Sequence, residues 1–573
     1  MSKGLIVYYR NGTPPDAVTW AQGFCERLLP DNATVKTPRV VASEHALSVV
    51  YGPLPSLLAD GLSFCLGAPA NPGPTHLAMD APAPDGTFAL LRCDGHAVKA
   101  STDYTASRSI WYCLTEDAFV VSTSQRMLVA ALGSYQPNTQ ALGWFLASGT
   151  LGPENAWDAR AQLLPGNSTI RFDPQSWRLD LQPGGTLTVR EVKRPDLEHE
   201  QRLRSAVDEA AASMISEDQQ WVLALSGGMD SRSLLYYLQE KGNVEAVTWG
   251  LRDAPKRPDS DAALAIQLAQ QCGLKHSYWV TDIEQANLEK VFARFVAAGE
   301  GRLDHLSGYM DGLALWARLS AKPVTMIRGY DAFGSKGPAR NEYQARDAST
   351  LLTADDFRDA FLPDELRASP DQIPQSLGRR PSESLADWRD RLWLEYRTPY
   401  VTASLDDIKF AYTEVVNPLL SRPVVETFQQ LPEHMRTHKR VFRHIVEQMF
   451  PGVPFARRDS VQHIGSIARQ SDVKTFLADK LRAAGGDSIL PVSFSHWLAN
   501  NLDQGEERIA RRRRVVATIR TYMPQPVQDM LRAIGHRTPR MDARRVAIRA
   551  VLADLATKQL AADASFHHRS TPQ

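Results

Sequence analysis

Short apolar runs separated by turn residues extend from Gly4 to about Arg194. Examples are GLIVYY, TFALLRC and AFVVSTS. Runs of this length, with polar breaks between them, are typical of short strands that pair in an antiparallel sheet. The pattern predicts that the first part of the chain is mostly β.

The pattern changes to helical spacing in the segment DLEHEQRLRSAVDEAAASMIS, whose apolar positions include Leu203, Val207, Ala211 and Met214. We therefore predict two domains, residues 1–195 and 196–573. The second domain opens with strand-like WVLALS, helical DSRSLLYYLQEK, strand-like VEAVTWG and another helix. This alternation indicates an α/β doubly wound parallel sheet, which binds ligands at the carboxyl ends of its strands. Beyond about residue 340 the pattern is largely helical.

Composition limits the kinds of partner and the kinds of site that we expect. The 573 residues include 65 Lys and Arg and 65 Asp and Glu, so no net basic field attracts nucleic acid or an anionic membrane. The five cysteines are widely spaced and form no CxxC pair, which argues against a disulfide framework or a structural zinc site. No apolar run approaches the roughly 20 residues of a membrane span. We expect a cytoplasmic protein without a nucleic-acid or membrane partner.

The string LALSGGMDS carries the clearest chemistry. Gly227 and Gly228 allow the backbone to bend closely around a ligand, and the N–H groups that follow face an anion at the positive end of a helix. Ser226 and Ser231 add hydroxyl donors, and Asp230 is a candidate ligand for Mg²⁺ that bridges phosphate oxygens. A plain serine-glycine turn is the alternative. The strand before it and the helix after it favour a phosphate site.

This unit resembles the pyrophosphate loop of ATP pyrophosphatases, in the form found in asparagine synthetases. The resemblance continues through the segments DSD at 259–261, RGYDAFG at 328–334, EVVNPLL at 414–420 and HKRVFR at 438–443. It implies ATP and Mg²⁺ as cofactors and an ATP pyrophosphatase-like domain with a helical C-terminal part. Such enzymes cleave ATP between the α and β phosphates, join AMP to a carboxylate and release pyrophosphate.

The resemblance also implies roles for single residues. Asp331 would share Mg²⁺ with Asp230, Lys439 would meet the leaving pyrophosphate, and Arg457 would substitute for a lysine that the family has and this chain lacks. Helix capping is the alternative for Asp331, and a solvated basic run is the alternative for Arg457. The residues expected around the base and ribose are Leu223, Leu225, Val247, Thr248 and Gly329.

The first domain resembles the glutamine-hydrolysing domain of asparagine synthetases through DGTFA at 85–89, VVSTS at 120–124 and LLPGNS at 163–168. This implies an α+β, Ntn-hydrolase-like β-sandwich. The family's nucleophile is a cysteine at the mature N-terminus, whereas this chain reads Met-Ser-Lys, and its earliest cysteine, Cys25, falls in a helical pattern. A serine is a much weaker nucleophile than a thiolate. We expect a degenerate amidotransferase-like domain that supplies no ammonia.

An enzyme that activates a carboxylate without ammonia takes its amine most simply from the same substrate molecule, so we expect a cyclase. Lasso peptide cyclases join the N-terminal amine of a precursor peptide to an Asp or Glu side chain, which forms a macrolactam. A leader-peptide protease of the same pathway is the implied partner. β-Lactam synthetase-type closure of a small β-amino acid and a catalytically inactive peptide-binding scaffold are the alternatives.

The lasso hypothesis is favoured over the β-lactam one by a departure from the β-lactam pattern. In β-lactam synthetases a tyrosine stands three positions before the loop aspartate and is supported by a glutamate. Here Arg328 has that position, Tyr330 adjoins Asp331, and Glu395 falls near the expected glutamate. Tyr330 and Glu395 are therefore candidate catalytic residues. A surface position on a helix is the alternative for Glu395.

Overall fold

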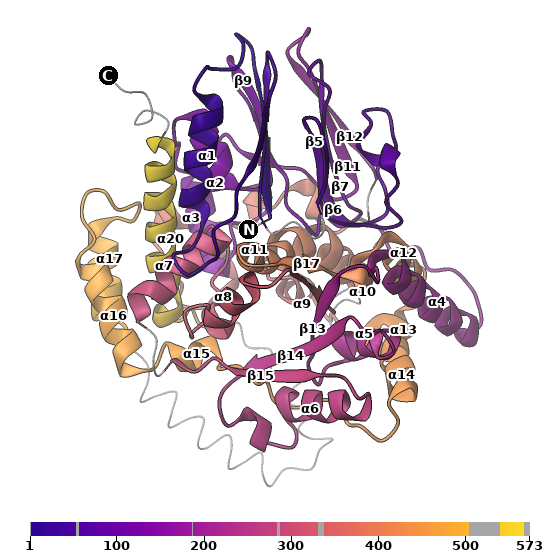
Figure 1. Ribbon diagram of the computed structural model, residues 1–573. Coiled ribbons are helices and arrows are strands. Elements are labelled where there is room, and N and C mark those ends of the chain that lie inside the picture. Colours follow the sequence, from indigo (N-terminus) through magenta and orange to yellow (C-terminus); the bar gives the residue numbers. More distant parts are fainter. Residues whose placement is uncertain are drawn as a thin grey trace.

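The computed structural model has a mixed α/β architecture with several sheets and many helices (Figure 1). The expectation of a mixed α/β protein is confirmed. The described residues are 2–52, 57–185, 187–283, 287–330, 337–503 and 539–566. In this part of the chain no helix is both long and apolar enough to cross a membrane.

The N-terminal region forms two antiparallel sheets of six strands each. One has the order β10-β8-β9-β1-β3-β2, with strands Gln162–Leu163, Trp111–Leu114, Ala118–Ser122, Lys3–Tyr9, Ala46–Tyr51 and Arg39–Ala42. The other has the order β12-β11-β7-β6-β5-β4, with strands Arg178–Pro183, Ser168–Asp173, Val98–Thr102, Gly86–Cys93, Ser63–Pro69 and Leu57–Asp60. Alternation along each strand decides which layer a side chain enters.

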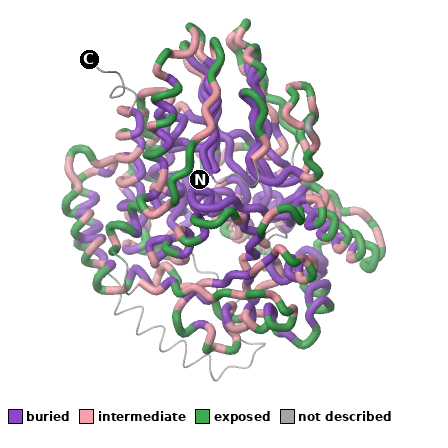
Figure 2. Tube along the Cα trace, in the orientation of Figure 1, coloured by how far each residue is buried: buried purple, intermediate pink, exposed green. Residues whose placement is uncertain are grey.

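Strand β1 shows this alternation. Ile6 and Tyr8 pack in the core between the two sheets, whereas Leu5 and Val7 face a helical layer. That layer contains α1 (Ala17–Leu28), α2 (Gln125–Leu132), α3 (Thr139–Ser148) and the C-terminal helix α20 (Ala543–Ala564). The inner strands of both sheets are mostly buried, whereas the edge strands β2, β4 and β12 have no buried residue; exposed residues also concentrate at the far ends of the sheets and on the outer helices (Figure 2).

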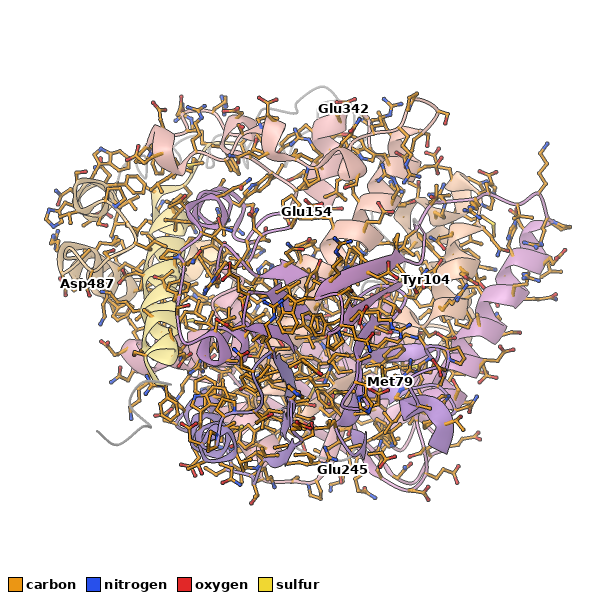
Figure 3. The ribbon with its side chains drawn as sticks, turned by 90° about the horizontal axis from the view of Figure 1, so that it is seen from above. Met79, Tyr104, Glu154, Glu245, Glu342 and Asp487 are labelled. Carbon is orange, nitrogen blue, oxygen red and sulfur yellow. The ribbon has the colours of Figure 1, made fainter. Side chains whose placement is uncertain are left out.

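Helix α20 attaches the C-terminal end of the described chain to the N-terminal region. Asp563 pairs with Arg126 of α2 (Nε to Oδ2, 2.6 Å), and both side chains are buried. Seen from above, α20 lies along one side of the molecule beside the N-terminal helices (Figure 3). The N-terminal sheets are therefore packed against chain segments from both ends of the sequence.

The third sheet has five strands, all parallel, in the order β15-β14-β13-β16-β17. Their bounds are His276–Val280, Val244–Gly250, Gln220–Ala224, Val324–Arg328 and Glu414–Val416. Val222 and Met326 face one helical layer, which contains α7 (Leu288–Gly299), α8 (Ala314–Ser320) and α11 (Ala403–Phe410). Leu223 and Ile327 face the other, which contains α4 (Asp196–Met214), α5 (Met229–Leu238), α6 (Asp261–Gln271), α12 (Arg422–Gln429) and α14 (Arg440–Met449).

The remaining helices cover these layers and connect them. They are α9 (Glu342–Ala348), α10 (Leu385–Leu392), the π-helix η9 (Trp393–Thr402), α13 (Glu433–Arg436), α15 (Ile464–Ile467), α16 (Ser471–Arg482) and α17 (Val492–Asn500). Short 3₁₀ turns are η1 (Pro74–Leu77), η2 (Ala254–Lys256), η4 (Leu306–Gly308), η5 (Ala354–Asp356), η6 (Asp364–Leu366), η7 (Pro370–Gln372), η8 (Gln375–Leu377), η10 (Pro418–Leu420) and η11 (Thr437–Lys439).

A buried ion network joins strand β1 to helix α11. The carboxylate of Asp407 pairs with the ammonium of Lys3 and with the guanidinium of Arg302 (2.8 Å to Nη1). All three side chains are almost fully buried. Beside them the Ser2 N–H donates to the carbonyl of Phe410 (2.6 Å). The first strand of the chain is thereby fixed to a helix that covers the parallel sheet.

The variant Asp407→Asn is expected to be strongly destabilised, because it leaves two buried cations without their shared carboxylate. Breaking a buried ion pair from one side costs about 3–5 kcal/mol. We expect a clearly lower midpoint of urea unfolding, measured by circular dichroism. Asp60→Asn, at an exposed strand end, is the control and should unfold like the wild type. An unchanged midpoint for Asp407→Asn would contradict the importance of this network.

Candidate functional site

A cavity of about 340 Å³ opens at the carboxyl edge of the parallel sheet. The register aligns Ala224 at the end of β13 with Val247 of β14 and Arg328 of β16, so the loops after these strands begin at the same edge. Its lining residues are Ala224, Leu225, Ser226, Asp230, Ser231, Thr248, Trp249, Asp261, Arg328, Gly329, Tyr330, Asp459, Ser460 and Val461.

The loop after β13 is held in shape by its two serines. The Ser226 N–H donates to Ser231 Oγ (3.0 Å), and the two hydroxyl oxygens lie 3.0 Å apart. The Gly228 N–H donates to Ser226 Oγ (3.2 Å). Gly228 is the N-cap of α5 and makes no side-chain cap hydrogen bond. Because the first N–H groups of a helix lack partners within it, the start of α5 presents donors and a positive dipole end beside the cavity.

Two glycines allow backbone segments to meet at this loop. A Cβ at Gly227 would lie 2.9 Å from the Cβ of Ala456, and a Cβ at Gly329 would lie 2.5 Å from the carbonyl carbon of Asp230. Neither distance is compatible with a side chain unless the backbone moves. The end of β16 is therefore packed directly on the backbone at the start of α5.

Arg232 holds the same loop in place through backbone carbonyls, a role that its sequence context does not predict. Its buried guanidinium donates to the carbonyls of Gly227 (3.0 Å), Val453 (2.9 Å) and Pro454 (2.8 Å). Burial lowers the pKa of Arg232 to about 10. An arginine between the serines of DSRSLLYYL was the available signal, but two of its three carbonyl partners, Val453 and Pro454, lie more than 200 positions away.

Lys439 and Asp230 meet at the start of α5. The ammonium of Lys439 lies 3.0 and 3.1 Å from the two carboxylate oxygens of Asp230, and its side chain is 2% exposed. His438 and Lys439 both have left-handed backbone angles, with φ of 60° and 53°. Non-glycine residues rarely adopt this conformation. The turn before α14 thus holds a strained backbone that carries the ammonium to the serine-glycine loop.

The expected metal pair is described only in part. Asp230 lines the cavity, whereas Asp331 lies outside the described residues. Within the described ranges no group of three or more His, Cys, Asp and Glu side chains is placed to hold a metal ion. A magnesium ion bound with ATP needs only one or two protein carboxylates, because phosphates and water complete its coordination. Asp230 fits that requirement.

Arg328 and Tyr330 form the wall beside the loop. The Arg328 guanidinium donates to Asp406 Oδ1 (2.7 Å) and lies over the Tyr330 ring, 4.4 Å from its centroid. Burial disfavours the charged guanidinium, but the Asp406 carboxylate, Tyr330 and Tyr309 together raise the pKa of Arg328. Lys409, 3.5 Å from the same carboxylate oxygen, has a pKa well below its usual range because of burial and the nearby Arg328 charge.

The wall expected to contact the base and ribose is only partly lined by the predicted residues. Leu225, Thr248 and Gly329 line the cavity, and the Thr248 hydroxyl donates to the Leu225 carbonyl (2.7 Å). Leu223 and Val247 do not line it, because their side chains are in the core and their backbones pair within the sheet. Trp249, which adjoins Thr248, also lines the cavity.

Other candidate residues do not line the cavity either; they are Gly227, Gly228, Lys439, Glu395 and Arg457. The carboxylate of Glu395 accepts from Arg391 Nη1 (2.8 Å) and from the Leu187 N–H (3.0 Å). Ion pairing with Arg391 on the preceding helical turn thus holds Glu395 away from the expected pairing with Tyr330. Arg457 is exposed, and its backbone N–H donates to the Asp259 carbonyl (2.9 Å).

The segment after Arg457 contributes to the cavity, although the sequence does not predict it. Asp459, Ser460 and Val461 line the cavity, and the Ser460 carbonyl accepts from the Leu251 N–H (2.8 Å). Gly250 leaves room for this contact, since a Cβ there would lie 2.4 Å from the Ser460 carbonyl oxygen. No local pattern marks these residues as part of a site.

Comparison with known proteins gives one partial family match. A model of the asparagine synthase family matches residues 202–305, a span that contains the serine-glycine loop. A search of curated proteins finds no match.

Two solved structures show weak likeness. Glutamine phosphoribosylpyrophosphate amidotransferase from B. subtilis, complexed with ADP and GMP, is 9% identical with a TM-score of 0.21, and the match covers 48% of this chain and 81% of that one. A structure described as the allosteric regulatory enzyme of purine biosynthesis is 10% identical with a TM-score of 0.20, and the match covers 61% of this chain and 77% of that one. Scores this low carry no argument about this chain.

The variant Gly329→Ala is expected to disturb the serine-glycine loop, because the added methyl group meets the Asp230 backbone. Overpacking of this kind costs about 1–3 kcal/mol. We expect a lower melting temperature, measured by scanning calorimetry. Gly242→Ala, where a Cβ meets nothing within 4 Å, is the control. Equal behaviour of the two variants would contradict the close packing at Gly329.

Proposed function

We propose that this protein is an ATP-dependent carbon–nitrogen ligase that forms AMP and pyrophosphate. The observation that carries the proposal is the uncapped start of α5, which lies beside two hydroxyls and the ammonium of Lys439 at the edge of a parallel sheet. Donors converging in this way suit the β and γ phosphates of ATP. The asparagine synthase match across this loop supports the same class of reaction.

We propose the following roles for the residues of the site. The Ser226–Ser231 loop binds the pyrophosphate portion of ATP, and Lys439 stabilises the charge that grows there as pyrophosphate leaves. Asp230 and Asp331 are the proposed holders of Mg²⁺. When bound, this ion neutralises phosphate charge and orients the triphosphate. Lys439 already contacts Asp230, so the proposed metal and pyrophosphate ligands adjoin each other.

The proposed reaction has two steps. A substrate carboxylate oxygen attacks the α phosphorus, and the bond from that phosphorus to the bridging oxygen breaks, which releases pyrophosphate. An amine of the same substrate then attacks the acyl carbon, loses a proton, and displaces AMP with the electrons of the acyl C–O bond. Holding the amine about 3–3.5 Å from the acyl carbon supplies much of the acceleration through proximity.

For the substrate we propose a precursor peptide, closed to a lasso-type macrolactam between its N-terminal amine and an Asp or Glu side chain. Support comes from a second cavity of about 740 Å³, whose lining includes residues between His463 and Arg469. This segment begins two residues after Val461 of the first cavity, so the two cavities share one stretch of chain. Tyr343, Phe357 and Arg545 also line it. Such a space suits a peptide better than a small β-amino acid.

The position of Glu395 bears on the β-lactam alternative. That alternative relies on a glutamate that supports a tyrosine at the cavity, and Glu395 is instead paired with Arg391. We therefore do not favour it. An inactive peptide-binding scaffold is tested by the assay below, and a leader-peptide protease of the same pathway is the proposed partner.

For residues 1–195 we propose a degenerate, Ntn-hydrolase-like amidotransferase domain without glutaminase activity. The Ser2 hydroxyl accepts from Arg108 Nη1 (3.1 Å) and is buried. Burial raises the pKa of Cys25 to about 12, which disfavours a thiolate nucleophile at neutral pH. For residues 196–573 we propose an ATP pyrophosphatase-like cyclase domain that acts in the cytoplasm.

The experiment incubates the protein with ATP, Mg²⁺ and linear peptides that carry a free N-terminal amine and an internal Asp or Glu. We expect AMP and pyrophosphate by ion-exchange chromatography, and peptide product lighter by one water by mass spectrometry. EDTA should stop the reaction. Formation of ADP would reject the adenylation chemistry, and the absence of any nucleotide cleavage across the peptide set would favour the scaffold.

The variants Asp230→Asn and Lys439→Met are expected to lose activity while they stay folded. Each removes one charged group from the proposed pyrophosphate site, and losses of about 10²–10³-fold in turnover are typical for a single electrostatic contact. AMP release under saturating ATP measures the effect. Lys275→Met, at an exposed ion pair with Glu245, is the matched control. Retained turnover in Asp230→Asn would remove Asp230 from the site.

A further inference from the structure

The cavity at the sheet edge is lined by three acids and one base. Among its described lining residues, Asp230, Asp261 and Asp459 carry carboxylates and Arg328 alone carries a cationic side chain. Lys439 is not among the lining residues, but its ammonium pairs with Asp230, which is. Any anion held within the cavity itself must therefore be met by Arg328, by backbone donors or by hydroxyls.

Arg328 lies directly beside the serine-glycine loop. It is the last residue of β16, and the next residue, Gly329, is packed on the backbone of Asp230 and Ser231. Strand β16 pairs with β13 on the side opposite β14, which carries Thr248 and Trp249. The Arg328 guanidinium therefore lies on one side of the loop, and strand β14, which carries Trp249, lies on the other.

Two contacts hold the guanidinium in place. Nη1 donates to Asp406 (2.7 Å), and the guanidinium carbon lies 4.4 Å from the centroid of the Tyr330 ring. The side chain is 14% exposed, and that of Asp406 is 5% exposed. A guanidinium has five N–H donors in a planar fork, and among the described residues that of Arg328 forms one hydrogen bond, to Asp406, so donors remain with which to bind an anion. Its orientation is set before any ligand arrives.

We infer that Arg328 binds the α-phosphate of ATP and of the acyl-adenylate, and that Asp406 is its positioning residue. This rests on the proposed function for the identity of the nucleotide. The start of α5 and Lys439 account for the β and γ phosphates, which leaves the α-phosphate as the group beside the β16 flank. Attack on the α phosphorus increases negative charge on its oxygens, and a fixed guanidinium stabilises that charge.

The test measures binding of AMP, ATP and pyrophosphate, each with Mg²⁺, by titration calorimetry on the full chain. AMP carries the α-phosphate without the others, and pyrophosphate carries the others without it. Arg328→Gln is expected to weaken the affinity for AMP by about 10- to 100-fold, the range for a lost hydrogen bond to a charged group. The affinity for pyrophosphate is expected to stay unchanged. Lys439→Met is expected to show the reverse pattern.

Matched variants separate this effect from general damage. Arg318 also stacks on an aromatic ring, 4.6 Å from the centroid of Trp279, but does not line the cavity, so Arg318→Gln should bind AMP like the wild type. Arg328→Lys keeps the charge and loses the planar fork, so its AMP affinity should fall less than that of Arg328→Gln. If Arg328→Gln melts early, Arg328→Lys decides the question alone.

The role of Asp406 needs a measurement whose result would not change if Asp406 were only structural. Asp406→Asn should weaken AMP binding when Arg328 is present. In the Arg328→Gln background the same substitution should weaken AMP binding little further, because a positioning residue acts only through its partner. Equal losses in both backgrounds would overturn the role of Asp406. Unchanged AMP affinity in both Arg328 variants, with ATP binding intact, would overturn the inference and leave the proposed function standing. Failure of the wild type to bind ATP would instead reject the proposed function.

Discussion

The direct contact between two backbones, at Gly329 and at Asp230, is the constraint on which the site depends. Parallel pairing of β13 with β16 brings both strand ends to one edge. The glycine then lets the chain after β16 touch the first turn of α5, where a Cβ would lie 2.5 Å from a carbonyl carbon. Because this spacing is fixed by backbone atoms, side chains on either strand end keep a constant relation to the helix start.

Helix α11 extends that constraint to the N-terminal sheets. Adjacent aspartates on this helix have different partners, since Asp406 binds Arg328 at the cavity and Asp407 binds Lys3 of β1. Both pairs are nearly excluded from water, where losing a partner costs most. The N-terminal region therefore bears on the site, because its strand β1 is fixed to the helix that carries Asp406.

Local patterns predicted the parts of the site that are local. The Ser226–Ser231 loop is contiguous and lies between a strand and a helix, so its place at the sheet edge followed from sequence. The clamp by Arg232 and the lining by Asp459–Val461 could not be predicted, because both depend on contacts between residues far apart in the chain. The contacts of Glu395 could not be predicted for a related reason. Its partner Arg391 lies one helical turn away, but the Glu395 carboxylate also accepts from the Leu187 N–H, about 200 positions earlier, and no residue of η9 is among those lining the cavity.

Charge and burial at the β16 flank bear on the proposed contact with an anion. Arg328 and Lys409 both lie beside the carboxylate of Asp406, and all three side chains are largely buried. Burial, together with the nearby Arg328 charge, holds the pKa of Lys409 well below its usual range, so Lys409 favours its neutral form and Arg328 carries the positive charge of this cluster. In such low-dielectric surroundings the proposed attraction between Arg328 and an anion would be stronger than at an exposed arginine.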